Sequence, residues 1–307
     1  MLSMDYRMMD YRMIEEICAK YGAEYKKNEC LASYTSFKIG GRCPILIKPN
    51  GIDCLREIVS EFNRGNKEYR IIGKGSNILV SDKGVDFPVI SLSSITKTEV
   101  DGERMICTAG MPLIGLCRLA AEQSLSGLEF AYGIPGSTGG AVYMNAGAYG
   151  GEMKDVVCEC TFIDSDGELV RAAAEDLDFS YRHSFFSGKK CIITEIKLML
   201  HKGDKNEIQN TMDELMQRRR DKQPLEYPSA GSTFKRPEGD FAGRLIEAAG
   251  LKGFSVGGAQ VSEKHCGFVI NKGGATFDDV KVLIERVREK VKENSGVSLE
   301  TEVVVWE

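Results

Sequence analysis

The chain has 307 residues, of which 42% are hydrophobic and 28% charged, with a formal net charge of −5 at pH 7. This composition is typical of a soluble globular protein of two or three domains and excludes the disordered, collagen-like and membrane-spanning classes. The acidic balance argues against a broad nucleic-acid surface, because phosphate backbones require clustered Lys and Arg. The N-terminus alternates Met, Asp, Tyr and Arg without an apolar export signal, so we expect a cytoplasmic protein.

The ten cysteines are scattered along the chain, a distribution typical of reduced thiols rather than of a disulfide framework. The one close pair, Cys158 and Cys160, alternates with other residues in a predicted strand, which places both sulfurs on one sheet face. Core packing is favoured there over a metal site, which needs four converging ligands. Because the chain has only three histidines, no metal site is expected.

Taken in chain order, hydrophobic periodicity and turn residues predict a mixed α and β protein. The first part has predicted helices over 11–21 and 53–64, strands over 69–72, 78–80, 89–92 and 104–108, and a helix opened by Pro112. After a glycine-rich segment, 133–151, come a hairpin of 155–164 and 168–171, a strand over 190–200 and a charged helix over 204–222. The last part has a helix over 241–249, a helix that begins at a capping box on Thr276, and a strand over 299–306. A duplicated pentapeptide, Met4–Met8 and Met9–Met13, is too short to be a solenoid repeat.

Two glycine clusters predict loops that hold an anion. The cluster 73–77 directly follows a predicted strand, and the cluster 133–140 precedes a predicted helical turn over 141–145. Glycine permits positive φ and close approach, so consecutive N–H groups can converge on a pyrophosphate. The first cluster is not a Walker A loop, because Ser76 follows the glycine where that loop has lysine, and it is not a dinucleotide fingerprint, because Ile78 replaces the third glycine.

Longer motifs resemble those of the UDP-N-acetylenolpyruvoylglucosamine reductase family, flavoproteins of peptidoglycan precursor synthesis. These motifs run in order from about residue 34 to the C-terminus. The matching segments are Thr35–Gly41, Gly73–Asn77, Gly133–Tyr149, Tyr181–Ser184, Pro228–Pro237 and Leu299–Val303. The chain is similar to the shorter subclass of the family, which lacks an additional tyrosine-bearing loop over the substrate.

The resemblance implies an α+β fold class: a two-subdomain FAD-binding fold of the vanillyl-alcohol-oxidase (PCMH) type, followed by a C-terminal α+β substrate-binding domain. The expected parts are an N-terminal helical leader over 1–33, an FAD-binding domain over 34–199 that is split near 95, and a substrate-binding domain over 200–307. The implied cofactor is noncovalent FAD, with NADPH as reductant and a UDP-linked enolpyruvyl sugar as substrate. We expect a monomer with no nucleic-acid partner and no membrane span.

The reaction implied by the resemblance is the NADPH-dependent, FAD-mediated reduction of UDP-N-acetylglucosamine enolpyruvate to UDP-N-acetylmuramate. Hydride passes from flavin N5 to C3 of the enolpyruvyl group, and C2 receives a proton. Arg182 fits this chemistry, because a planar guanidinium can hold a carboxylate bidentately while negative charge develops beside it. The family assigns Ser232 as the proton donor and Glu302 as the catalytic carboxylate. Ser232 does not lie in the G-x-S-x-G elbow of a hydrolase, so it is not expected to be a nucleophile.

The same motifs contain further expected binding residues. Those expected to bind the cofactor are Gly73, Gly75, Ser76, Asn77, Gly133, Pro135, Gly136, Ser137, Gly139, Gly140, Ala141, Asn145 and Gly147. Those expected to bind the substrate are Tyr149, Arg218, Lys222, Lys235 and Lys264. Two alternatives stay open: another noncovalent FAD oxidoreductase of the same fold, or a nonenzymatic flavin- or nucleotide-binding protein in which Ser232 and Glu302 would be dispensable.

Overall fold

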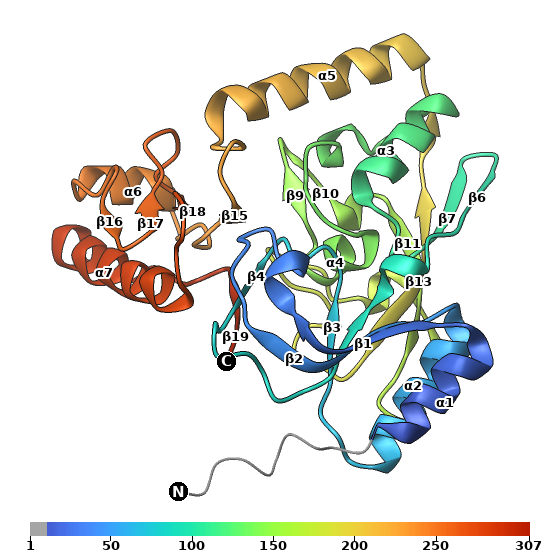
Figure 1. The fold of residues 1–307 in the computed structure, drawn as a ribbon. Helices are drawn as coiled ribbons and strands as arrows, with labels where there is room; N and C mark the ends of the chain where they lie inside the picture. Colours follow the sequence, from blue (N-terminus) through green and yellow to red (C-terminus); the bar gives the residue numbers. More distant parts are fainter. Residues whose placement is uncertain (1–10) are drawn as a thin grey trace, which may run out of the picture. The chain divides into compact units, whose positions relative to one another are not determined.

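The chain forms two compact units, seen here in a computed structural model that describes residues 11–307 (Figure 1). The first unit comprises the described residues up to Asn28 together with Pro44–Lys74 and Asp86–Gln217. The second comprises Glu29–Cys43, Gly75–Val85 and Arg218–Glu307. The second unit is therefore assembled from three separate stretches of sequence. The domain boundaries expected at residues 33 and 199 stay a prediction, and most of the duplicated pentapeptide lies outside the described residues.

Two larger sheets organise the first unit. The first has the order β1-β2-β5-β3, in which β2 and β3 each pair with β5 in parallel. The second is antiparallel throughout, in the order β12-β11-β13-β7-β6. The strands of the two sheets are β1 (Glu24–Cys30), β2 (Arg42–Lys48), β3 (Arg70–Ile72), β5 (Val89–Ser91), β6 (Thr98–Asp101), β7 (Arg104–Thr108), β11 (Val157–Ile163), β12 (Leu169–Ala173) and β13 (Ile192–Met199). Two short pairs add β8 (Leu125–Ser126) with β14 (His201–Lys202) and β9 (Gly147–Ala148) with β10 (Gly151–Glu152).

The helices of the first unit cover a continuous apolar core. They are α1 (Arg12–Tyr21), α2 (Ile52–Arg64), α3 (Leu113–Glu122) and α4 (Thr138–Tyr143), and α5 (Lys205–Lys222) continues into the second unit. Figure 1 shows α1 and α2 side by side, and their facing residues, Cys18 and Cys54 among them, are fully buried. Gly22 ends α1 in the left-handed conformation, as the sequence predicts.

The second unit has its own sheet and core. The antiparallel order is β15-β18-β17-β16, formed by β15 (Ser229–Ser232), β16 (Ser255–Val256), β17 (Ala259–Val261) and β18 (Phe268–Asn271). Two helices, α6 (Ala242–Ala248) and α7 (Phe277–Ser295), pack with this sheet, and α7 buries the apolar stripe that contains Leu283 and Val287. A separate parallel pair joins β4 (Ile78–Val80) to β19 (Val304–Trp306).

Most of the predicted elements are confirmed to within one or two residues, including the hairpin of β11 and β12 and the long charged helix α5. All ten cysteines are free thiols, and Cys160 is fully buried. Among residues 11–307, no helix has the length and apolarity needed to span a membrane. The strand β1 was not anticipated, because its residues are mostly charged and exposed.

Two predicted elements need correction. The helical turn expected over 141–145 begins earlier, at Thr138, because the Ser137 hydroxyl accepts a hydrogen bond from the Gly140 N–H and caps the first turn. The strand expected over 299–306 covers only Val304–Trp306. The preceding residues change partner: Thr301 forms an isolated bridge with Phe234, whereas β19 pairs with β4.

The capping box of α7 gives a pH-dependent prediction. The Asp279 carboxylate accepts hydrogen bonds from the N–H groups of Thr276 and Gly258, which lower the pKa of Asp279. A lowered pKa stabilises the fold above the usual carboxyl range, and this contribution is lost as the pH falls through the lowered value. We expect Asp279→Ala to lower the free energy of unfolding by about 1 kcal/mol at pH 7.

The measurement is urea unfolding at pH 7 and at pH 3, with Asp278→Ala as the control in the same turn. The deficit of Asp279→Ala should shrink between pH 7 and pH 3, because the Asp279 carboxyl takes up a proton in the unfolded chain at a higher pH than in the folded chain. Asp278→Ala should change little at either pH. An equal deficit of Asp279→Ala at both pH values would contradict the assigned role.

Candidate active site

The two glycine-rich loops meet within the first unit. Gly73 follows β3, and a Cβ atom added to it would lie only 2.4 Å from the Ser137 Oγ. No larger residue fits there unless Ser137 moves. The first loop therefore approaches the N-terminal end of α4 closely. Packing within the protein alone requires glycine at position 73.

The second unit holds the rest of the first loop by its backbone. Gly75 has a φ of 60°, and a Cβ atom there would lie 2.0 Å from the Tyr34 carbonyl oxygen. The Ser36 N–H donates to the Gly75 carbonyl over 3.0 Å, while the Ser36 hydroxyl donates to the Ser229 carbonyl over 2.6 Å. Ser36 thus links this loop to the strand that carries Ser232.

The first three N–H groups of α4 are used within the protein. Thr138 donates to the Met111 carbonyl, Gly139 donates to the Ala109 carbonyl, and Gly140 donates to the Ser137 hydroxyl. These three donors are therefore already hydrogen-bonded within the protein, and the contact of Gly139 and Gly140 with the cofactor stays a prediction.

Arg182 stands in a two-residue turn of the first unit. Ser180 and His183 exchange two backbone hydrogen bonds, each with 3.2 Å between nitrogen and oxygen. Arg182 has a φ of 55°, a left-handed conformation that is uncommon for residues other than glycine and must be held by its surroundings. Its guanidinium carbon lies 5.0 Å from the centre of the Tyr181 ring, within the range of a cation–π interaction.

The chain that follows the turn is anchored to buried groups. Ser184 is fully buried and donates from its hydroxyl to the Tyr143 carbonyl over 2.7 Å. Phe186 is also fully buried, and its ring meets the Phe162 ring edge-on with 5.2 Å between ring centres. These contacts explain why a serine two residues after Arg182 belongs to the motif.

Tyr149 lies at the tip of the β9–β10 hairpin, where Tyr149 and Gly150 both have positive φ, as a type I′ turn requires. Tyr149 is 41% exposed. Asn145, just before this hairpin, is fully buried and donates to the Glu152 carboxylate over 2.6 Å and to the Ser180 carbonyl over 3.0 Å. The structure thus joins the Tyr149 hairpin to the Arg182 turn.

Ser232 follows a bulge in the second unit. The pairing of β15 with β18 shifts register between Ser229 and Ser232, and Gly231 within this interval has a φ of 76°. A bulge with glycine in the left-handed conformation redirects the side chain that follows. The next residue, Thr233, is fully buried and its hydroxyl accepts a hydrogen bond from the Val269 N–H, so the end of the bulge is fixed.

Glu302 is held from two directions in the same unit. Its N–H donates to the Thr233 carbonyl over 2.8 Å, and its carbonyl accepts from the Asn77 side-chain amide over 3.1 Å. The Asn77 carbonyl in turn accepts from the Val304 N–H over 3.0 Å. The structure therefore brings Ser232 and Glu302 onto neighbouring segments, and it ties both to the first glycine-rich loop. Arg182 belongs to the other unit.

Comparisons with known proteins agree over nearly the whole chain. A family model described as "UDP-N-acetylenolpyruvoylglucosamine reductase, C-terminal domain" matches residues 223–306, and one described as "FAD binding domain" matches residues 44–173. The curated reductase of that name from Fervidobacterium nodosum is 47% identical, with 96% of each chain covered. The one from Thermotoga maritima is 48% identical over 91% of this chain and 97% of the relative.

The chain belongs to the UDP-N-acetylenolpyruvoylglucosamine reductase family. The crystal structure of the reductase from Thermus caldophilus agrees, with a TM-score of 0.80, 37% identity, and coverage of 93% of this chain and 99% of that one. The resemblance noted in the sequence motifs is thereby confirmed, as are the α+β fold class and the FAD-binding domain.

The basic residues that were expected to bind the substrate lie in different surroundings. Arg218 and Lys222 are exposed and four residues apart on α5, which places them on the same face of the helix. Lys235 forms an ion pair with Glu300, with 3.2 Å between nitrogen and oxygen. Lys264 instead donates to the Arg220 carbonyl over 2.6 Å, so it supports the last turn of α5. Its predicted contact with substrate stays a prediction.

Sequence reasoning did not identify His265, which supports the Ser232 segment. Its Nδ1 accepts a hydrogen bond from the Gly267 N–H, and the Gly267 carbonyl accepts from the Thr233 N–H. Burial lowers the pKa of His265, so the ring is neutral at pH 7. A lone histidine between Lys264 and Cys266 carries no sequence signal for such a role.

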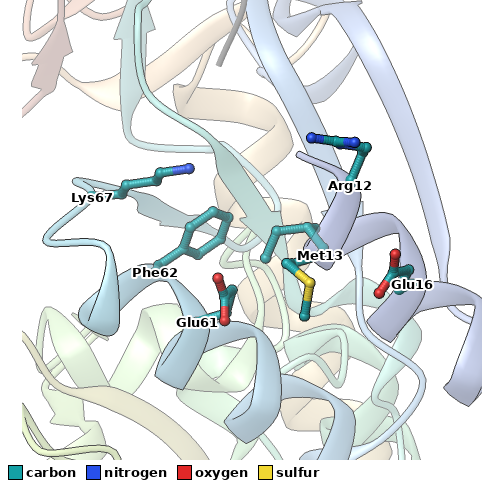
Figure 2. Close-up of a pocket in the computed structure, with 7 residues that line it drawn as sticks. Arg12, Met13, Glu16, Glu61, Phe62 and Lys67 are labelled. Atoms are coloured by element: carbon teal, nitrogen blue, oxygen red, sulfur yellow. The ribbon is translucent and has the colours of Figure 1, made fainter. Parts of the chain in front are cut away.

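A pocket of about 310 Å³ lies elsewhere in the first unit, between the start of α1 and the end of α2 (Figure 2). Its lining residues are Arg12, Met13, Ile14, Glu16, Glu61, Phe62 and Lys67. Figure 2 shows the apolar side chains of Phe62 and Met13 with acidic and basic side chains around them. No residue of the family motifs lines this pocket, so we assign it no part in the reductase chemistry.

The bulge before Ser232 gives a prediction about positioning. Gly231→Ala meets no atom within 4 Å, but it forces alanine into the left-handed region at a cost of about 1–2 kcal/mol. Relaxation of that strain would change the direction in which the Ser232 side chain points. A shift of a catalytic group by about 1 Å can reduce turnover by about a hundredfold. We therefore expect Gly231→Ala to lower steady-state reductase turnover by tenfold or more.

Gly296→Ala is the matched control. Gly296 has a φ of 75°, belongs to the same unit, ends α7, and likewise has no atom within 4 Å of an added Cβ. Thermal unfolding should report similar losses of stability in the two variants, whereas only Gly231→Ala should lose turnover. Equal turnover in both would show that the bulge does not position Ser232.

Proposed function

We propose that the chain catalyses the NADPH-dependent reduction of UDP-N-acetylglucosamine enolpyruvate to UDP-N-acetylmuramate, with noncovalent FAD as the redox cofactor. Its family membership supports the overall reaction. The observation that carries the residue assignment is the hydrogen bond between Glu302 and Thr233, which holds the carboxylate-bearing residue beside the segment that presents Ser232.

Bound FAD would supply the hydride relay between NADPH and C3 of the enolpyruvyl group. The residues that would hold it are those of the first loop, Gly73–Asn77, and of the segment Gly133–Ser137. Support for this assignment comes from the close approach of Gly73 to Ser137, which brings the first loop against the start of α4. The later residues, Gly139, Gly140, Ala141 and Gly147, would shape the loop.

Arg182 would bind the carboxylate of the enolpyruvyl group. When C3 accepts hydride, negative charge develops at C2 and spreads into this carboxylate. A guanidinium at the tip of an anchored turn can hold both carboxylate oxygens and stabilise that charge. The strained backbone at Arg182 supports this role, because such conformations persist where the surrounding structure fixes a functional side chain.

Ser232 would donate the proton to C2. A serine hydroxyl is a weak acid at neutral pH, but a carbanion-like carbon is far more basic, so an oriented hydroxyl can protonate it. Glu302 would polarise the enol system or relay a proton to the same centre. Neutral His265 would act only through the backbone of this segment, because its Nδ1 already accepts the Gly267 N–H.

The other substrate contacts would come from α5 and from the β9–β10 hairpin. Arg218 and Lys222 on α5 would bind the diphosphate, and Tyr149 would contact the sugar nucleotide from its exposed hairpin. The C-terminal part from about residue 200 would form most of the substrate domain, which the match over 223–306 supports. The enzyme would act as a monomer in the cytoplasm, where NADPH and UDP-linked sugars occur.

Replacement of Ser232 separates the two halves of the reaction. We expect Ser232→Ala to be reduced by NADPH at the wild-type rate, because that half needs no proton at C2. Oxidation of the reduced flavin by the enolpyruvyl substrate should slow by about 10²- to 10⁴-fold. Anaerobic stopped-flow absorbance of the flavin, with each substrate mixed separately, measures both rates.

Ser229→Ala, on the same strand, is the matched control and should leave both rates unchanged. If Ser232→Ala reoxidises at the control rate, Ser232 is not the proton donor. If the wild-type flavoprotein is reduced by NADPH but is not reoxidised by the enolpyruvyl sugar, the chain is another FAD oxidoreductase of the same fold. A chain that binds FAD and reacts with neither substrate would be a nonenzymatic flavin-binding protein.

A further inference from the structure

Near the Arg182 turn, the side-chain amide of Asn145 makes three hydrogen bonds within the protein. The residue is fully buried and has a φ of 40°, a conformation that asparagine tolerates better than most residues. Its side-chain nitrogen donates to the Glu152 carboxylate and to the Ser180 carbonyl, and its side-chain oxygen accepts from the Lys154 N–H over 2.9 Å. Both donor hydrogens are therefore committed to the protein.

The bond to Ser180 acts where the Arg182 turn begins. Ser180 is the first residue of the two-residue turn, and its N–H and carbonyl also pair with His183. Fixing the Ser180 carbonyl therefore limits rotation of the peptide that leads to Tyr181 and Arg182. On the far side of the turn, the Ser184 hydroxyl holds the Tyr143 carbonyl at the end of α4. Asn145 and Ser184 thus attach the two ends of the turn to neighbouring residues of one short segment.

Glu152 holds the Asn145 amide in its orientation. Its carboxylate accepts from Asn145 over 2.6 Å, and its other oxygen lies 2.8 Å from the Lys154 ammonium. A charged acceptor orients the amide of Asn145 so that the second hydrogen points at Ser180, and charge-assisted hydrogen bonds are the stronger kind. Aspartate has no such donor, and glycine keeps the backbone conformation but loses all three bonds.

We propose that Asn145 is a positioning residue for the reaction, which sets the Arg182 guanidinium through the Ser180 carbonyl. This inference rests on the proposed role of Arg182 in holding the enolpyruvyl carboxylate. It differs from the contact with FAD expected from the motif, because the side chain is buried and engaged within the protein.

The principal variant is Asn145→Gly, which keeps the left-handed backbone accessible. We expect its flavin content and its rate of reduction by NADPH to match the wild type. Oxidation of the reduced flavin by the UDP-linked enolpyruvyl sugar should slow by about 10- to 100-fold, the scale of a misplaced functional group. Asn66→Gly is the control, because Asn66 is an exposed asparagine of the same unit with a φ of 47°.

A double-mutant cycle tests whether Asn145 acts through Arg182. If it does, Asn145→Gly combined with Arg182→Ala should reoxidise no more slowly than Arg182→Ala alone. A further multiplicative loss in the double variant would overturn the inference, as would a wild-type rate in Asn145→Gly. Loss of bound flavin with slowing of both half-reactions would assign Asn145 to the cofactor instead and overturn it too.

Two further variants distinguish a failure of this inference from a failure of the proposed function. If Asn145→Gly does not fold, Glu152→Gln, which keeps the shape of that side chain but removes the charged acceptor that orients the Asn145 amide, should show a smaller loss of the same selective kind, and a wild-type rate in it would count against the inference. If Arg182→Ala itself reoxidises at the wild-type rate, the proposed role of Arg182 fails. The inference then falls with it, whereas a failure confined to Asn145 leaves the proposed function intact.

Discussion

The arrangement of the predicted catalytic residues depends on asparagine side chains that satisfy backbone carbonyls of irregular segments. Asn77 donates to the Glu302 carbonyl, and Asn145 donates to the Ser180 carbonyl. Neither carbonyl belongs to a named strand, so each needs a partner from outside regular structure. An asparagine amide donates two hydrogen bonds and accepts two from a short side chain, which lets one residue join a loop to a distant segment.

Asn77 ends the first glycine-rich loop and Asn145 lies within the second glycine-rich segment, 133–151, and the two residue types contribute complementary properties. Gly73 and Gly75 allow the backbone to come within contact distance of Ser137 and Tyr34, where any Cβ would collide. The first loop consists of glycine and polar residues and has no apolar anchors of its own, so its position must be fixed by hydrogen bonds. Ser36, which bonds both the Gly75 and Ser229 carbonyls, provides such an anchor in the second unit.

The sequence predicted the helices well because their signals are local. The glycine that ends α1 and the Thr276–Asp279 capping box of α7 are read from a few adjacent residues, and both are present. The start of α4 was misplaced because glycines normally weaken a helix, whereas here Gly139 must pack against Ala109 with no room for a Cβ.

The residues of the candidate site were predicted one by one from family motifs, but the contacts that hold those residues in place were not. The bond between Asn77 and Glu302 joins residues 225 positions apart, and no local pattern reports it. The bulge at Gly231 and the buried ring of His265 likewise depend on tertiary partners. Residues with reactive side chains can be recognised in a motif, whereas the hydrogen bonds that orient these side chains form only in the folded chain.

The parallel pairing of β4 with β19 affects how the protein is made. During synthesis, residues 78–80 leave the ribosome long before 304–306, and at about 5–20 residues per second the interval is roughly 10 to 45 s. Throughout that time the first glycine-rich loop lacks its C-terminal partner strand. The second unit therefore cannot be completed until residues 304–306 have been made, and chains that stall before that point should expose an unpaired strand edge that invites aggregation.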